Sequence, residues 1–483
     1  MQHPSAAVPR LVVAGLSGDS GKTVVSLGLL LLARQSGIPA KAFKKGPDYI
    51  DAAWLSWASG APARNLDTFL MGPQKSAQLF RAHALPDGLN LIEGNRGLFD
   101  GADAHGTHST AELAKLLKAP VLLVVNATKV THTVAALVLG CMKLDPDVRI
   151  GGVILNHVAG SRHESVLRES VESTCGIPVL GVLPNVDASA LLPGRHLGLV
   201  TPQEHESIGR LREKILATVQ GRLDTGRIFQ LAGSAPPIPR WAEKPRKTED
   251  GRGLKIAYLK DSAFTFYYPE NLEALERSGA RLQPVSALSA SALPEGLDAL
   301  YIGGGFPETH AAALSQNTAL LGSIYDDAQR GLPIYAECGG LMLLSQAIRW
   351  KGMRFPMAGA LPFEVEVCPK PQGHGYVELQ VDSPNPYYPV GTRVRGHEFH
   401  YSRIIPARYP ATTVCAVRRG TGSFNGRDAV LVQNIWASYT HVHAEATPQW
   451  AQGLLRVARR WSLQRSGRPA PLSAIHPSQS HAA

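Results

Sequence analysis

The sequence predicts an α/β protein of two domains, and three features of the chain support this prediction. The chain has 483 residues, more than one hydrophobic core usually organises. Short apolar runs alternate with longer amphipathic runs in both halves, as in sheets covered by helices. A stretch rich in Pro, Gly and charged residues interrupts this alternation. We therefore predict a first domain at 1–228, a linker at 229–253, a second domain at 254–463 and a disordered tail at 464–483.

The first predicted domain alternates runs of strand length with runs of helix length. Buried strands are short and apolar, whereas helices are longer and amphipathic. This order builds a mostly parallel sheet with helices on both faces. The predicted strands are 11–14, 89–92, 121–125, 152–155 and 179–182, and the predicted helices are 22–35, 109–117, 131–144 and 164–174.

The second predicted domain starts a new alternation after the linker and ends with a helix. Its apolar runs again have the length of strands. The predicted strands are 256–259, 299–302, 332–335, 375–381, 393–400 and 429–432, and the closing helix is 449–461.

The composition is that of a soluble protein of the cytoplasm. Hydrophobic residues make up 44% and charged residues 18%, which argues against disorder. No apolar run is long enough to cross a bilayer, and the first ten residues lack an apolar signal region. The five cysteines are widely spaced without a C-x-x-C pair, which argues against a disulfide framework or a zinc site. We therefore expect a cytoplasmic protein with no membrane partner.

The formal net charge of +10 does not by itself indicate a nucleic-acid partner. The Lys and Arg residues are scattered, and no known nucleic-acid module is present. A basic solvated surface explains the charge, and the alternative is a field that attracts a nucleotide and a polyanionic substrate. We expect no nucleic-acid partner and leave a homodimer open.

A glycine-rich loop follows the first predicted strand. Residues 15–23 read GLSGDSGKT and precede an apolar helix, the setting of a phosphate-binding loop. Backbone N–H groups of small residues converge on phosphate oxygens at the helix N-terminus. The spacing is one residue longer than in the standard loop, a form that some carboxylate-activating synthetases share. We assign ATP binding to Gly18, Asp19, Ser20, Gly21, Lys22 and Thr23, with Lys22 on the β- and γ-phosphates and Thr23 on Mg²⁺.

Two acidic segments lie where strands are expected to end. The segment FKKGPDYID, 43–51, contains Lys44, Asp48 and Asp51, and IEGNRGLFDG, 92–101, contains Glu93 and Asp100. Ligands of open α/β sheets bind outside the carboxyl ends of strands, so Glu93 and the loop are expected to face one cleft. An Mg²⁺ ion held by Thr23, Asp48 and Glu93 would bridge nucleotide phosphates.

This set of residues suits the activation of a carboxylate. A carboxylate is a poor electrophile toward ammonia, whereas an acyl phosphate has phosphate as its leaving group. Lys22, Lys44 and Mg²⁺ would stabilise the charge on the transferring phosphoryl group.

A cysteine in the second domain has the setting of a nucleophile. Cys338 lies in PIYAECGGLMLL, between an apolar strand and an apolar helix, where the helix dipole and a nearby histidine are expected to lower its pKa. Upstream, YIGGGFPE ends another strand, and we assign the oxyanion and glutamine site to Gly304, Gly305 and Gly339. Downstream, WASYTHVHAE supplies His441 as the base, with His443 interpreted as supporting or structural.

Together these motifs resemble the cobyrinic acid a,c-diamide synthase family over roughly 9–461. The first domain resembles a P-loop synthetase akin to dethiobiotin synthetase, and the second a class I glutamine amidotransferase. The matching segments, in chain order, are SGKT, GPDYID, RNLD, EGNRGLFDG, STAELAKLL, RHLGL, GGGFPE, AECGGLM, RGHEFHYS and ASYTHVH.

The resemblance implies an activity and several site residues. Glutamine would be hydrolysed at Cys338, and the ammonia would attack a phosphorylated acetate side chain of a corrin-like macrocycle. The positions matching Asp48, Tyr49, Glu93 and Asp100 would line the ATP and carboxylate site, with Asp48, Glu93 and Asp100 as catalytic residues. We place Tyr49, Asp51 and Arg96 at the acceptor site. Asn156, at a strand end, is assigned to the adenine, and a simple turn residue is the alternative.

The sequence also departs from the family pattern. Class I triads commonly end H-x-E, but the third position here is His443, so the thiol–imidazole pair would lack a carboxylate that orients it. Polar residues replace the expected apolar ones at Lys45, Asn95 and Arg96, and Asn126 replaces an aspartate.

These departures keep other substrates and functions open. Siroheme or sirohydrochlorin, with or without nickel, also carries acetate side chains. A synthetase that takes only free ammonia would leave Cys338 idle. A P-loop regulatory ATPase with an inactive sensor domain is the alternative that is not a ligase.

Overall fold

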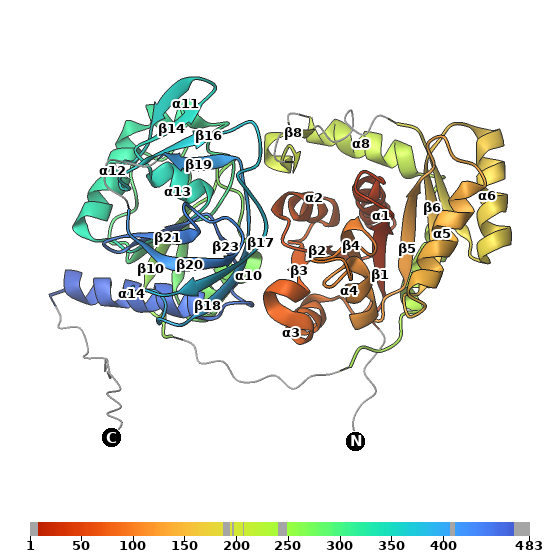
Figure 1. Cartoon of the computed structure of the whole chain (residues 1–483), viewed down its shortest axis with the longest axis horizontal. Helices are drawn as coiled ribbons and strands as arrows, with labels where there is room; N and C mark the ends of the chain where they lie inside the picture. The colour runs from red at the N-terminus through yellow and green to blue at the C-terminus, as the bar shows by residue number, and fades with distance from the viewer. Residues whose placement is uncertain are drawn as a thin grey trace, which may run out of the picture. The chain divides into compact units, whose positions relative to one another are not determined.

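The computed structural model describes residues 8–186, 194–195, 198–205, 207–239, 249–405 and 411–467. The chain forms two compact units, Met1–Pro245 with Phe266–Pro269, and Arg246–Thr265 with Glu270–Ala483 (Figure 1). Residues 240–248 of the predicted linker and 468–483 of the predicted tail lie outside the described residues.

The first unit is built on a seven-stranded parallel sheet of order β3-β2-β4-β1-β5-β6-β7. This confirms the predicted parallel α/β fold, and all five predicted strands are present. Two further strands, β2 and β3, extend the sheet beyond β4. The strands are β1 (Arg10–Gly15), β2 (Ala40–Lys45), β3 (Arg64–Leu66), β4 (Leu89–Gly97), β5 (Val121–Asn126), β6 (Ile150–Val158) and β7 (Val179–Pro184).

Helices cover both faces of this sheet. Connections between parallel strands are right-handed. A helix that leads to the next strand in one direction along the sheet therefore covers one face, and a helix that leads in the other direction covers the opposite face. One face has α1 (Lys22–Gln35), α2 (Tyr49–Ser59) and α8 (Ile208–Val219), with α1 in contact with the other two. The other has α3 (Thr68–His83), α4 (Thr110–Leu116), α5 (Thr133–Leu144) and α6 (Ser161–Cys175), of which α5 and α6 lie side by side in Figure 1.

The remaining elements of the first unit are short. They are β8 (Gly194–Arg195), β9 (Gly198–Leu199), the 3₁₀ helix η1 (Pro202–Glu204) and α9 (Thr225–Gly233). Because α9 ends at Gly233, helical structure extends into the segment predicted as a linker. Within the described ranges, no helix combines the length and apolar character that a membrane span requires.

The second unit contains a ten-stranded mixed sheet of order β11-β10-β12-β13-β22-β21-β20-β17-β18-β23. The first five strands of this order pair in parallel, and the remaining pairs are antiparallel. The predicted α/β fold is confirmed, and its sheet includes an extensive antiparallel part. The strands are β10 (Lys255–Leu259), β11 (Arg281–Val285), β12 (Ala299–Ile302), β13 (Ile334–Glu337), β17 (Gly373–Val381), β18 (Arg393–His400), β20 (Thr413–Arg419), β21 (Arg427–Val432), β22 (Ile435–Ser438) and β23 (His441–Val442).

A four-stranded sheet and five helices complete the second unit. The sheet has the order β15-β14-β16-β19. Its strands are β14 (Ala347–Trp350), β15 (Met353–Pro356), β16 (Glu364–Val367) and β19 (Ser402–Ile405), and the helices are α10 (Pro269–Arg277), α11 (Ala311–Gln316), α12 (Thr318–Arg330), α13 (Gly339–Leu344) and α14 (Gln449–Arg465).

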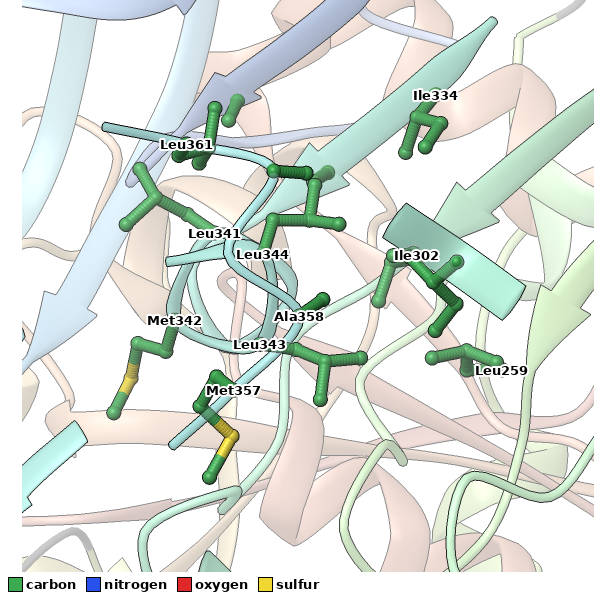
Figure 2. Packing of buried hydrophobic residues seen from close by; sticks show 14 of the residues in the cluster. Leu259, Ile302, Ile334, Leu341, Met342, Leu343, Leu344, Met357, Ala358 and Leu361 are labelled. Atoms are coloured by element: carbon green, nitrogen blue, oxygen red, sulfur yellow. The ribbon is translucent and has the colours of Figure 1, made fainter. Parts of the chain in front are cut away.

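The short helix α13 is packed on all sides and anchors the turn before it. Every residue of α13 is buried, and its leucines belong to the core of the second unit. Figure 2 shows Leu341, Met342, Leu343 and Leu344 among Leu259, Ile302 and Ile334 of neighbouring strands. A Cβ on Gly340 would lie 2.6 Å from the Ile302 carbonyl oxygen, so α13 approaches β12 more closely than other residues would allow. This packing fixes the position of Cys338, directly before α13.

Candidate active site

The phosphate-loop prediction corresponds to a tightly folded turn between β1 and α1. The Ser20 hydroxyl and the Lys22 ammonium each donate to the Ser17 carbonyl at 2.8 Å. Asp19 and Gly21 adopt positive φ of 52° and 90°, which reverses the chain within the loop. Burial, and then the nearby Lys44, lower the pKa of Lys22. Gly18 and Asp19 at the tip are exposed, so the loop presents its tip to a ligand.

Asn156, at the end region of β6, supports the loop from below. Its side-chain Nδ2 donates to the Ser20 carbonyl at 3.0 Å, and its Oδ1 accepts the His157 N–H at 2.9 Å. A Cβ on Gly21 would lie 2.1 Å from Asn156 Nδ2, so only glycine fits there. Both the oxygen and the nitrogen of the Asn156 side-chain amide therefore make hydrogen bonds within the protein. Its assignment to adenine stays a prediction.

A buried cluster of opposite charges lies across β2 and β4. Lys44 and Glu93 are register neighbours, and Lys44 Nζ lies 2.8 Å from Glu93 Oε1 and 2.6 Å from Asp51 Oδ2. The Thr23 hydroxyl donates to Glu93 Oε1 at 3.2 Å. Although burial lowers the pKa of Lys44, Asp51 and Glu93 raise it overall, whereas burial raises the pKa of Glu93. Thr23, Lys44, Asp51 and Glu93 thus lie together, and their assignments to the metal, ATP and the acceptor stay predictions.

Asp48 is the N-cap of α2 beside this cluster. Its Oδ1 accepts the Ile50 N–H at 2.8 Å and the Asp51 N–H at 2.9 Å. Asn65 Nδ2 donates to the Asp48 carbonyl at 2.9 Å, which fixes the turn before the helix. Burial and then the Asp51 carboxylate raise the pKa of Asp48 to about 6.

The oxygen donors of this cluster fit Mg²⁺. Among the described residues, no group of three His, Cys, Asp or Glu side chains could hold a metal ion by themselves. Mg²⁺, however, usually takes one or two carboxylates together with substrate phosphates and water. The adjacent hydroxyl of Thr23 and carboxylate of Glu93 match that preference, with Asp48 as the third predicted ligand.

The loop after β4 lies beside the phosphate loop. The Leu98 N–H donates to the Gly15 carbonyl at 2.7 Å, and Asp100 Oδ2 accepts the Gly97 N–H at 2.8 Å. Arg96 is exposed and has a positive φ of 50°. These contacts bring Asp100 to the edge of the site, and its catalytic role stays a prediction.

Tyr49, at the first turn of α2, belongs to an aromatic cluster of the first unit. Its ring stacks on Phe266 with centroids 5.1 Å apart and a 2° angle, and it contacts Tyr268 at 4.4 Å. The Tyr268 hydroxyl donates to the Pro47 carbonyl at 3.0 Å. This aromatic cluster thus lies next to the Asp48 turn.

Cys338 occupies a strained turn between β13 and α13. Its φ of 49° and ψ of −98° lie in a region that non-glycine residues rarely adopt, as expected for a nucleophile on a sharp strand-to-helix turn. Its N–H donates to the Ser438 carbonyl at 2.7 Å. The prediction of a lowered thiol pKa is wrong: the side chain is 5% exposed, and burial followed by the Glu308 carboxylate raises the pKa of Cys338.

The glycine-rich turn after β12 meets the nucleophile turn. A Cβ on Gly339 would lie 3.1 Å from the backbone nitrogen of Gly305, so the two turns are in direct contact. A Cβ on Gly305 would lie 2.0 Å from the Ala263 carbonyl oxygen, which excludes any side chain there. Gly304 is buried in the same turn. The backbone groups predicted to form the oxyanion hole are therefore gathered beside Cys338.

His441 lies on β23, next to β18, and its ring has two close neighbours. Its Nδ1 lies 3.4 Å from Glu337 Oε2, on the residue directly before the nucleophile. The His397 ring stacks on it with centroids 5.0 Å apart. Burial and then His441 lower the pKa of His397 well below its usual value, which favours a neutral His397 ring stacked on His441.

His443 has a separate partner, and its interpretation as a supporting or structural residue stays a prediction. Its Nδ1 accepts the Glu445 N–H at 3.1 Å, which leaves the proton on Nε2. That nitrogen lies 3.4 Å from Glu270 Oε2 in a fully buried pair.

Several residues of this site were not predicted from the sequence. Asp428 on β21 accepts the Tyr439 and Thr440 N–H groups at 3.2 and 3.3 Å and so fixes the turn before His441. His397 and Glu337 adjoin the imidazole itself. In the sequence, His397 and Glu337 are visible only as polar residues inside RGHEFHYS and AECGGLM. The pairing of the strands is what shows that they lie near His441.

The fold and the two sites define a glutamine amidotransferase in one chain with a P-loop nucleotide-binding unit, a ligase class that uses glutamine and ATP. A family model described as the CobQ/CobB/MinD/ParA nucleotide binding domain matches residues 11–200. A model described as the CobB/CobQ-like glutamine amidotransferase domain matches residues 255–449.

Relatives that span both units narrow this class. A Magnetococcus marinus protein named cobyrinate a,c-diamide synthase is 43% identical, covering 94% of this chain and 97% of that protein. Proteins of the same name from Archaeoglobus fulgidus and Salmonella typhimurium are 39% and 38% identical, covering 90% and 93% of this chain and 94% and 98% of the relatives. The chain belongs to the cobyrinate a,c-diamide synthase family.

Proposed function

We propose that this enzyme converts the a- and c-acetate carboxylates of cobyrinate, a corrin-type tetrapyrrole, into amides. The name shared by relatives that span almost the whole chain supports this substrate. The observation that carries the activity is the pair of sites. One is the strained cysteine turn, whose preceding residue Glu337 lies 3.4 Å from His441, and the other is the phosphate loop, whose Thr23 contacts Glu93.

Glutamine hydrolysis would take place in the second unit. The Cys338 sulfur attacks the side-chain amide carbon, and His441 takes the thiol proton and passes it to the departing ammonia. Backbone N–H groups near Gly305 and Gly339 stabilise the oxyanion of the tetrahedral intermediate. Water then cleaves the thioester, so that glutamine and water become glutamate and ammonia. Because burial raises the pKa of the Cys338 thiol, His441 would take its proton as the sulfur attacks.

Carboxylate activation would take place in the first unit. An acetate oxygen of the acceptor attacks the γ-phosphorus of ATP, and ADP leaves. Ammonia then attacks the acyl carbon, phosphate departs, and the amide forms. Lys22 and the backbone of the phosphate loop hold the transferring group. Thr23, Asp48 and Glu93 would hold Mg²⁺, and such an ion supplies neutralising charge at nucleotide phosphates.

Mass spectrometry of products identifies the acceptor. We expect the purified enzyme, supplied with ATP, Mg²⁺ and glutamine, to convert cobyrinate to a product with two amides. Siroheme, sirohydrochlorin and nickel-sirohydrochlorin are tested in parallel. Amidation of one of these instead of cobyrinate would overturn the proposed substrate, and ATP hydrolysis without any amide product would favour a regulatory ATPase.

The Cys338→Ala variant tests the nitrogen source. We expect it to lose glutamine-dependent amidation and to keep amidation with added ammonium salt. Unchanged glutamine-dependent turnover would remove Cys338 from the mechanism.

A further inference from the structure

Glu337 directly precedes the nucleophile in the chain, and its carboxylate lies 3.4 Å from Nδ1 of the proposed base, His441. It is the last residue of β13, directly before Cys338, and its register partner on β22 is Ser438, three residues before His441. Its carboxylate is 0% exposed, and His441 beside it is 2% exposed. Strand pairing therefore brings together two residues that are 104 positions apart in the chain.

Three donors converge on the Glu337 carboxylate. Oε2 lies 3.4 Å from His441 Nδ1 and accepts the Tyr301 hydroxyl at 3.4 Å, while Oε1 accepts the Val442 N–H at 3.3 Å. The Tyr301 oxygen itself accepts from Asn271 Nδ2 at 3.2 Å, so its own proton points to Glu337. Burial raises the pKa of Glu337, and the hydrogen bonds from His441, Val442 and Tyr301 oppose this rise. Donors on both oxygens favour the ionised carboxylate, because it can only accept hydrogen bonds.

An ionised Glu337 would set the tautomer of His441. When Nδ1 carries the proton and donates it to a carboxylate, Nε2 is the nitrogen that can accept a proton from a nucleophile. The carboxylate also stabilises the imidazolium that forms when the thiol proton is transferred. Position 443, where a class I triad commonly has glutamate, is occupied by a histidine that pairs with Glu270 instead.

We propose that Glu337 is the positioning carboxylate of the glutaminase site, which orients His441 and stabilises its protonated form from the residue next to the nucleophile. This inference rests on the proposed glutamine hydrolysis at Cys338. Glu337 would be a third member beside the predicted pair of Cys338 and His441. It comes from β13, whereas class I triads commonly take their carboxylate from the segment after the histidine.

Glutaminase kinetics of Glu337→Gln test the proposal. Glutamine keeps the size of the side chain and removes its charge. We expect kcat for glutamine hydrolysis to fall by at least about tenfold, with a much smaller change in KM, because the lost interaction acts on the proton transfer. Glu337→Asp, which keeps the charge on a shorter side chain, should retain more activity than Glu337→Gln. Amidation driven by ammonium salt should stay at the wild-type level in both.

Glu270→Gln is the matched control. Glu270 is a buried glutamate at the same 3.4 Å separation from a histidine, His443, but it does not adjoin the nucleophile. We expect Glu270→Gln to keep glutaminase kcat within a few-fold of wild type. Equal losses in Glu337→Gln and Glu270→Gln, or wild-type kcat in Glu337→Gln, would overturn the role of Glu337. In the second case Cys338→Ala still decides whether glutamine hydrolysis itself occurs.

A measurement on the wild-type enzyme needs no stable variant of Glu337. The ¹⁵N chemical shifts of the His441 ring, assigned by comparison with His441→Gln, report which nitrogen carries the proton. We expect neutral His441 to be protonated at Nδ1. A proton on Nε2 would overturn the proposal, whatever the variants do.

Discussion

At the scale of single residues, Asp48 combines a helix cap with a shifted pKa. It caps α2, and its pKa is raised to about 6 by burial and by Asp51. A carboxyl with a higher pKa in the folded chain than in the unfolded chain binds more protons when folded. The free energy of unfolding therefore falls as the pH rises from about 4, the unfolded value, to about 6.

We expect Asp48→Asn to remove this pH dependence while it keeps the cap, because the amide oxygen can accept the same N–H groups. Between about pH 4 and pH 7, the stability of wild type should fall relative to the variant by on the order of 2 kcal/mol. Urea unfolding across this range measures the difference. Asp224→Asn, which exchanges the capping residue of α9, is the control. A wild-type to Asp48→Asn difference that is constant with pH would contradict the assigned shift.

At the scale of elements, the close packing of α13 on β12 makes Gly340 a sensitive position. We expect Gly340→Ala to lower the free energy of unfolding by about 1–3 kcal/mol, because its Cβ would overlap the Ile302 carbonyl. Glutaminase activity should fall with it, since the displaced helix carries the Cys338 turn. Denaturant unfolding and glutamine hydrolysis are the measurements.

Gly322→Ala provides the matched control for this substitution. Gly322 lies in α12 of the same unit, and apart from its chain neighbours and the backbone of its own helix no described atom lies within 4 Å of the added Cβ. Alanine should stabilise that helix by roughly 0.5–1 kcal/mol relative to glycine. If Gly340→Ala were equally harmless, the contact between α13 and β12 would not be as close as described.

The elements differ in how well the sequence predicted them. Predicted bounds agree with α1, β12 and β18 because strong apolar patterns end at clear breaks there. The strand β2, with the sequence AKAFKK, was missed because its three lysines hide the alternation. The helix α2 was missed because its first turn, after the Asp48 cap, was interpreted only as a binding segment.

At the scale of the whole molecule, the sequence indicated candidate residues for the two sites but not the contacts between residues that are far apart in the chain. Local motifs were sufficient to select Lys22, Glu93 and Cys338 as candidates, because phosphate loops and nucleophile turns are made by neighbouring residues, and their roles stay predictions. The Glu337–His441 pair was not predicted, because it depends on the pairing of β13 with β22, which a single sequence does not specify.

Because the two sites use different residues, we predict that one half-reaction can be lost without the other. Lys22 belongs to the phosphate loop of the first unit, whereas Cys338 and His441 lie in the second. We expect Lys22→Ala to abolish amidation with either glutamine or ammonium salt, because the charge on the transferring phosphoryl group loses its main counter-ion.

The same Lys22→Ala variant should keep much of the glutaminase activity, measured as glutamate released. Lys143→Ala, which removes an exposed lysine from the last turn of α5, is the control and should affect neither reaction. Together with the opposite pattern expected for Cys338→Ala, this would establish that nitrogen release and carboxylate activation use different residues. If Lys22→Ala lowered both activities to the same extent, glutamine hydrolysis would require an occupied nucleotide site, and the two half-reactions would have to be treated as one coupled cycle.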